Sequence, residues 1–132
     1  MIPFFNFNVN PKGHKTGDCS TRALVGTLGI SYEEALQLQM KWALKTYYDP
    51  TSKQVIEKVL NEFGYVKMKQ PRHISDNSKY EVGHLYQILT EKQMEEGVLV
   101  TVANHHTCIT KGKVQDIWDC RHKCVCNYYV KQ

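Results

Sequence analysis

The sequence predicts an α+β domain, with N-terminal helices packed on an antiparallel β-sheet formed by the C-terminal part. Apolar residues recur with a helical period through the first two thirds of the chain. From Gly97 onward the segments become short, β-branched or aromatic, and turns separate them. Because the strands follow the helices instead of alternating with them, a doubly wound sheet is not expected. The 132 residues contain no linker, repeat or low-complexity tract, so residues 1–132 are expected to form one domain.

The first predicted helix follows a strand and a polar loop. The opening segment MIPFFNFNVN alternates apolar and polar residues as a strand does. Residues 10–17 are rich in turn-forming residues and lead to Asp18, a suitable N-cap for a helix over residues 19–28. Cys19 then lies in the first turn of that helix.

Three further helices and four strands are expected. The helix over residues 31–44 begins with a Ser-x-x-Glu capping box, and the helix over residues 51–64 begins with Thr-x-x-Gln and ends at a glycine. A fourth helix is expected over residues 83–93. The predicted strands lie within residues 97–104, 105–112, 113–119 and 126–132.

Composition excludes several classes of function. The net charge is +4, but the basic residues are scattered and form no run with interleaved aromatic residues, so nucleic acid is not expected as a partner. The N-terminal segment lacks a basic leader and a cleavage site, and no segment has the apolar length that crosses a bilayer. Five cysteines are an odd number for a disulfide framework, which favours reduced thiols. We therefore expect a soluble, cytoplasmic protein without membrane contacts.

Cys19 is the first candidate for chemistry. A thiol at a helix N-terminus is favoured as the thiolate, because unpaired backbone N–H groups stabilise negative charge there. The neighbouring carboxylate of Asp18 opposes this, unless capping absorbs its charge, so the site needs a cationic partner. The alternative for Cys19 is a buried, inert thiol that packs as a small hydrophobic residue.

A partner is available in the segment HHTCITKGKVQDIWD. His105 or His106 begins one predicted strand, and Asp116 follows on the next strand of the same hairpin, so the two side chains can face each other. A cysteine, a histidine and a carboxylate supply a nucleophile, a base and a group that orients the base. Adjacent residues of a strand point to opposite faces, so we expect one of the two histidines to reach Cys19.

The segments GDCSTRAL and NHHTCITKGKVQDIWDC, with a final NYYV, resemble papain-like cysteine peptidases, in particular small phage and bacterial members of that superfamily. The resemblance covers most of the chain in order. It implies a papain-like fold, in which a helical part carrying Cys19 packs on a sheet carrying the histidine and the acid. The triplet from Asp116 to Trp118 is similar to the Asn-Ser-Trp of papain-type enzymes, whose amide orients the histidine and whose tryptophan shields that contact. Aspartate is a departure that many relatives share.

The same resemblance assigns the remaining roles. In the small phage-type relatives a histidine, a few apolar residues and a glycine precede the Asp-x-aromatic-Asp motif, and this pattern selects His105 as the base, with His106 as the alternative. Papain-type enzymes place a glutamine six residues before the cysteine for the oxyanion, but this position here is Gly13. The backbone N–H of Cys19 can supply one donor, and Asn10 or Thr16 a second. We expect Asn10 to fill this role.

The C-terminal cysteines offer a different function. Cys120, His122, Cys124 and Cys126 alternate along the chain, and sulfur and imidazole ligands suit zinc. Structural zinc sites, however, use pairs separated by two or more residues, and residues on one extended strand are too far apart to surround an ion. We expect these cysteines to lie in loops and edge strands.

Together these observations predict a cysteine hydrolase that cleaves an amide or isopeptide bond in a protein or peptide and needs no cofactor. Cys19 is the nucleophile, His105 the base and Asp116 the orienting acid. If the chain is phage-encoded, as the resemblance suggests, it would act on host or defence proteins in the host cytoplasm. The alternatives are a non-catalytic binding or inhibitor protein on the same fold and a zinc-binding interaction module.

Overall fold

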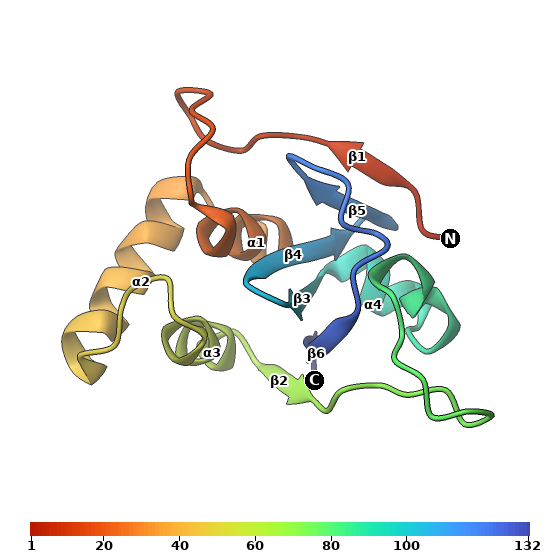
Figure 1. The fold of residues 1–132 in the computed structure, drawn as a ribbon. Coiled ribbons are helices and arrows are strands. Elements are labelled where there is room, and N and C mark those ends of the chain that lie inside the picture. The colour runs from red at the N-terminus through yellow and green to blue at the C-terminus, as the bar shows by residue number, and fades with distance from the viewer.

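A six-stranded sheet lies at the centre of the computed structural model, which describes residues 1–132 (Figure 1). Its strand order is β1-β5-β4-β3-β6-β2. The strands are β1 (Phe4–Asn6), β2 (Tyr65–Met68), β3 (Val98–Val102), β4 (His105–Thr110), β5 (Lys113–Asp116) and β6 (Val125–Lys131). Four of the five pairings are antiparallel, whereas β1 runs parallel to β5. The sheet is therefore mixed and not purely antiparallel as expected, because the long chain between β1 and β5 provides the crossover that a parallel pair requires.

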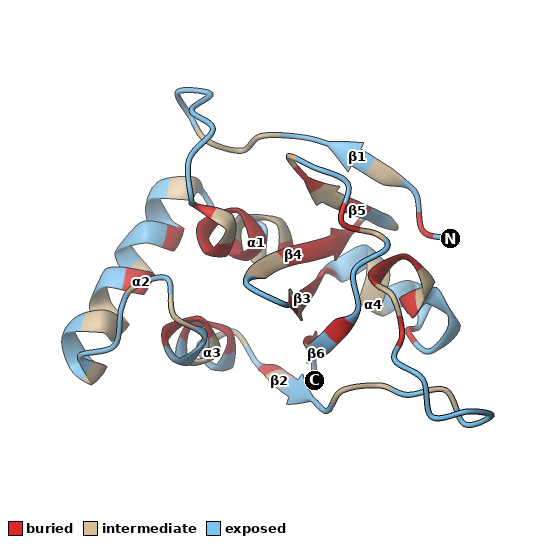
Figure 2. Ribbon diagram, viewed as in Figure 1, coloured by how far each residue is buried: buried red, intermediate tan, exposed pale blue.

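Three helices from the N-terminal half pack together beside this sheet (Figure 1). They are α1 (Cys19–Leu28), α2 (Tyr32–Thr46) and α3 (Lys53–Glu62), in the segments that the sequence predicted. Helix α1 contacts β3 and β4, and α2 contacts α1 and α3. Leu24, Leu60 and Leu99 are fully buried in the core between these helices and the sheet. Figure 2 shows that α1 and β4 are largely buried. The prediction of an α+β fold with helices packed on the sheet is thus confirmed.

The predicted fourth helix is divided into two elements. A 3-10 helix, η1 (Val82–Gln87), is followed by α4 (Glu91–Glu96). Thr90 begins α4 with a capping box, in which its hydroxyl accepts from the Gln93 N–H and the Gln93 side chain accepts from the Thr90 N–H. An N-cap residue has an extended backbone, so this cap interrupts the helical path between η1 and α4.

Two local predictions were wrong in detail. Strand β2 was not predicted, and its pairing with β6 joins Tyr65 to Lys131, near the other end of the chain. The N-cap of α3 is Ser52, not Thr51, since the Ser52 hydroxyl accepts from the backbone N–H of Val55.

None of the helices is both long and apolar enough to span a bilayer.

Candidate active site

Cys19 is the first residue of α1 and lies at the wall of a cavity of about 520 Å³. Its side chain is half-buried. Ser20 of the same helix and both His105 and His106 from β4 line the same cavity. The close packing of α1 on β4 therefore brings the start of the helix to the start of the strand. The structure places the predicted nucleophile beside both candidate bases.

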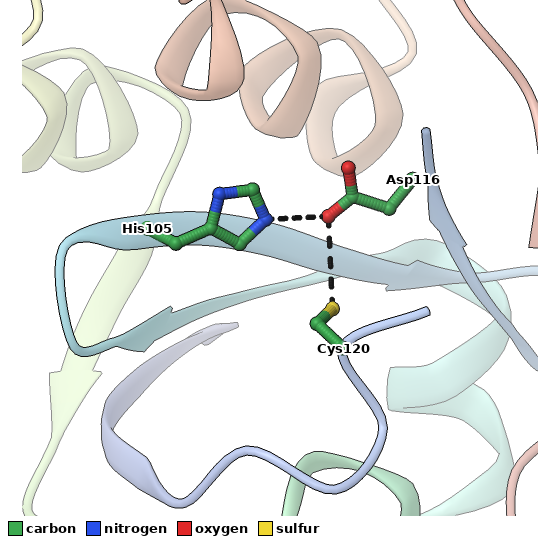
Figure 3. Close-up of side chains that lie close together, drawn as sticks. All are labelled: His105, Asp116 and Cys120. Carbon is green, nitrogen blue, oxygen red and sulfur yellow. Dashed lines mark hydrogen bonds and ion pairs between the residues drawn. The ribbon is translucent and has the colours of Figure 1, made fainter. Parts of the chain in front are cut away.

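His105 is joined to Asp116 by a short hydrogen bond. The distance between His105 Nε2 and Asp116 Oδ2 is 2.6 Å, and both side chains are at least nine-tenths buried (Figure 3). The other ring nitrogen, Nδ1, points away from Asp116, so it is the atom left for Cys19. The Trp118 ring lies against the imidazole, with 4.8 Å between the ring centroids. The backbone N–H of Ile117 donates to Asp116 Oδ1 over 2.7 Å and fixes the carboxylate.

The electrostatics of this group favour an ion pair. Hydrogen bonding to the side chains of His105 and then His106 lowers the pKa of Cys19 to about 5, although burial opposes the shift. Burial lowers the pKa of His105, but its hydrogen bonds with Asp116, Cys120 and Cys19 together raise that pKa to about 11. Burial raises the pKa of Asp116, but the hydrogen bond and charge of His105 and the hydrogen bonds from Thr107 and Ile117 together lower it, so the net direction is down. At neutral pH the site therefore contains a thiolate, an imidazolium and a carboxylate.

His106 borders the same cavity as Cys19 and His105, although one histidine alone was expected to reach the thiol. His105 is the first residue of β4 and directly follows Asn104, whose φ of 56° belongs to the turn before the strand. His105 and His106 pair with Val102 and Thr101 of β3 at this end of the hairpin, and both border the cavity. Both side chains contribute to the low pKa of Cys19.

A hydroxyl group orients the His106 ring. Ser20 Oγ lies 2.9 Å from His106 Nδ1 and donates its hydrogen to the carbonyl oxygen of Thr51, also over 2.9 Å. Because the serine has only one hydrogen to donate, His106 Nδ1–H is the donor toward Ser20. This arrangement leaves Nε2 of His106 as the atom available to the cavity.

Asp18 precedes the helix but does not cap it. No side-chain hydrogen bond reaches the first turn from Asp18, although its carbonyl accepts from the N–H of Arg22. Its carboxylate forms an ion pair with Arg22 and accepts from the Tyr32 hydroxyl over 2.6 Å. The charge of Asp18 is therefore absorbed by a side-chain cation, not by capping as the sequence suggested. The N–H of Ser20, which a capping carboxylate could bind, therefore donates no hydrogen bond, and neither does the N–H of Cys19.

The expected second oxyanion donor does not face the cavity. The amide nitrogen of Asn10 lies 3.4 Å from Asp18 Oδ2 and 3.3 Å from the Tyr32 hydroxyl, so both of its hydrogens have partners. Thr16 uses its carbonyl to accept from Asp18 N–H and from Arg22. Neither residue lines the cavity at Cys19. The Asn10 prediction is corrected on this ground, and the free backbone N–H groups at the start of α1 are the donors available there.

Arg22 is a residue of the site that the sequence did not reveal. Its guanidinium pairs with Asp18 and also lies 3.5 Å from Asp116 Oδ1. The spacing of four residues from Asp18 on a helix was a visible signal for the first contact. The second contact depends on the packing of α1 against the sheet and has no counterpart in the sequence.

His105, Asp116 and Cys120 offer one potential metal-ligand atom each, all within 4.8 Å of one another (Figure 3). Nitrogen and oxygen ligands around a tetrahedral zinc ion lie about 3.3 Å apart, given metal bonds of about 2.0–2.1 Å. The 2.6 Å between His105 and Asp116 is shorter and is the length of a charge-assisted hydrogen bond. The thiol of Cys120 donates to Asp116 Oδ2 over 3.6 Å. Hydrogen bonding explains why these three side chains lie together. The positive charge of Arg22 beside Asp116 disfavours a metal cation at the same place.

The C-terminal cysteines do not converge on an ion. Cys120 is buried at the candidate active site, whereas Cys124 and Cys126 are exposed. His122 is mostly exposed. Strand β6 begins at Val125, so the first three of these residues precede it and only Cys126 lies on the strand. Cys126 borders the same cavity as Cys19.

Comparisons of the chain with family models, with curated proteins and with solved structures gave no match.

Proposed function

We propose that this chain is a papain-like cysteine hydrolase that cleaves an amide or isopeptide bond. One observation carries the proposal: the thiol of Cys19 at a helix start borders a histidine that is hydrogen bonded to a buried carboxylate. Packing alone does not require a thiol with a pKa of about 5 next to an imidazole with a pKa of about 11. Such a pair is the activated state of a nucleophilic cysteine.

In this mechanism the thiolate of Cys19 attacks the carbonyl carbon, and the carbon–oxygen π electrons move to the oxygen. The free N–H groups of Cys19 and Ser20 stabilise the resulting oxyanion. When the intermediate collapses, the carbon–nitrogen bond breaks and His105 gives its Nδ1 proton to the leaving amine. A thioester on Cys19 remains.

Water completes the reaction. His105, now neutral, accepts a proton from a water molecule at Nδ1 while the water oxygen attacks the thioester carbon. The carbon–sulfur bond then breaks, the acid product leaves, and the thiolate and imidazolium are restored. Asp116 holds the ring throughout and stabilises its positive charge, and Trp118 covers the hydrogen bond between them.

The substrate is proposed to be a protein or peptide. The cavity is lined mainly by polar side chains and contains one lysine, Lys53, but no carboxylate. It is therefore suited to a polar or acidic segment. An action on host or defence proteins in a host cytoplasm follows from the resemblance to phage proteins alone.

A non-catalytic binding protein is the second candidate. It is favoured by Gly13, which lies in an exposed turn at the position where papain-type enzymes have the glutamine of the oxyanion hole. Such a protein would retain the fold and the polar cavity without turnover.

The pH dependence of Cys19 alkylation by iodoacetamide distinguishes these candidates. Peptide mapping by mass spectrometry follows each cysteine in the unmodified chain, and the exposed Cys124 serves as the internal reference. We expect labelling of Cys19 with a midpoint near pH 5, and a midpoint near the ordinary thiol value of about 8.5 in His105→Ala. An ordinary midpoint for Cys19 in the unmodified chain would contradict the hydrolase and leave the binding protein.

A further inference from the structure

We propose that Arg22 is a positioning residue that keeps the Asp18 carboxylate away from the start of α1 and so leaves the backbone N–H groups there free for the oxyanion. This inference rests on the proposed hydrolase function. It assigns the missing part of the oxyanion hole to the backbone and explains why an aspartate directly before the nucleophile is tolerated.

The contacts of Arg22 join the two ends of the site. One nitrogen, Nη1, pairs with Asp18, which precedes the nucleophile, and the other, Nη2, lies 3.5 Å from Asp116, which orients the base. All three side chains are more than nine-tenths buried. Two buried carboxylates without a cation between them would be costly, so the guanidinium is needed to hold them in this arrangement.

Asp18 has two competing uses. An aspartate at an N-cap position normally accepts from the second or third N–H of its helix, from an extended backbone conformation. Asp18 instead has φ and ψ of −104° and 27°, and its carboxylate is held by Arg22 and the Tyr32 hydroxyl. The pairing of Asp18 with Arg22 instead of capping leaves the N–H of Ser20, the second in the helix, without a partner. The N–H of Cys19, the first in the helix, has no intrahelical partner in any case.

The same contact protects the thiolate. The carboxylate of Asp18 belongs to the residue next to Cys19, and an uncompensated negative charge there would raise the pKa of the thiol. Pairing with Arg22 compensates this charge. Arginine suits the role because its planar fork can serve two carboxylates from two nitrogens, whereas a lysine offers one point of contact.

The experiment measures the midpoint of Cys19 alkylation in Arg22→Gln, in Arg22→Gln with Asp18→Ala, and in Arg22→Lys, with circular dichroism as the check of folding. In Arg22→Gln the released carboxylate both caps the helix and repels the thiolate, so we expect the midpoint to rise by about one pH unit or more. Removing that carboxylate with Asp18→Ala should reverse most of the rise. A merely structural role of Arg22 would not produce this reversal.

Arg22→Lys keeps a charge and most of the alkyl stem, and it carries the test if Arg22→Gln does not fold. We expect an intermediate rise of its midpoint, because a lysine cannot serve both carboxylates. An unchanged midpoint in folded Arg22→Lys and Arg22→Gln, with an activated Cys19 in the unmodified chain, would overturn this inference alone. An ordinary Cys19 in the unmodified chain would instead contradict the hydrolase itself.

Discussion

A Cβ atom built on Gly26 would lie 2.3 Å from the Sγ of Cys108. Helix α1 and strand β4 therefore meet at a point where the helix has room for a glycine only. The same helix and strand begin with Cys19 and His105, respectively.

Gly26→Ala is expected to destabilise the protein by about 1–3 kcal/mol, because the added methyl overlaps a buried side chain that has one rotatable bond. The higher helix propensity of alanine, about 1 kcal/mol, acts in the opposite direction and is smaller than the overlap. Urea denaturation measures the difference. Gly26→Ala combined with Cys108→Ala is the control, since the next contact, with the Cβ of Cys108, is an ordinary 3.6 Å. Equal stability losses with and without Cys108→Ala would show that the overlap is not the cause.

Asp116→Asn tests the source of the high pKa of His105. The substitution keeps the shape of the side chain and removes its charge, and hydrogen bonding to Asp116 is the strongest of the interactions that raise this pKa. We expect the pKa of His105 to fall from about 11 by one to three units, which an NMR titration of the ring protons measures. The sign follows from the imidazolium losing its negative partner. Cys120→Ser serves as a control with a smaller expected effect, and an unchanged His105 titration in Asp116→Asn would disprove the assignment.

Replacing His105 should raise the alkylation midpoint of Cys19 more than replacing His106. Hydrogen bonding to His105 is the largest cause of the low pKa of Cys19, and hydrogen bonding to His106 is the second. In His105→Ala the alkylation midpoint should therefore approach about 8.5, and in His106→Ala it should remain below about 7. Because the two residues are neighbours on β4, each variant is the matched control of the other. The reverse order of effects would identify His106 as the base.

The first three helices were predictable because their signals are local. Capping residues and a helical period of apolar positions lie within each segment, and the boundaries follow closely. Strand β2 has four residues and no alternation of its own, and it becomes a strand by pairing with β6 near the other end of the chain. The parallel pairing of β1 with β5 could not be predicted for the same reason, because it depends on contacts between distant parts of the chain.

The candidate site shows the same difference between residues predictable from local sequence and residues that depend on contacts between distant elements. Cys19, His105 and Asp116 were found through motifs at a helix start and in a hairpin, both of which are local in sequence. The role of Arg22 at Asp116 and the position of Cys120 depend on contacts between elements. The wrong donor, Asn10, was chosen for its place before the helix, but its amide finds partners in Asp18 and in Tyr32 of α2.

Ser20 connects helix α1, which begins with Cys19, to His106, and its replacement tests the contribution of His106 to the pKa of the thiol. Ser20→Ala removes the acceptor at 2.9 Å from His106 Nδ1 and the donor to the Thr51 carbonyl, so stability should fall by about 0.5–1.5 kcal/mol. Without this support the His106 ring can rotate away from Cys19, and the alkylation midpoint should rise. If Ser20 acts on Cys19 only through His106, the double variant Ser20→Ala, His106→Ala must show the same midpoint as His106→Ala alone. Additive shifts of the two substitutions would instead mean that the hydroxyl of Ser20 affects the thiolate directly, through the cavity that both residues line.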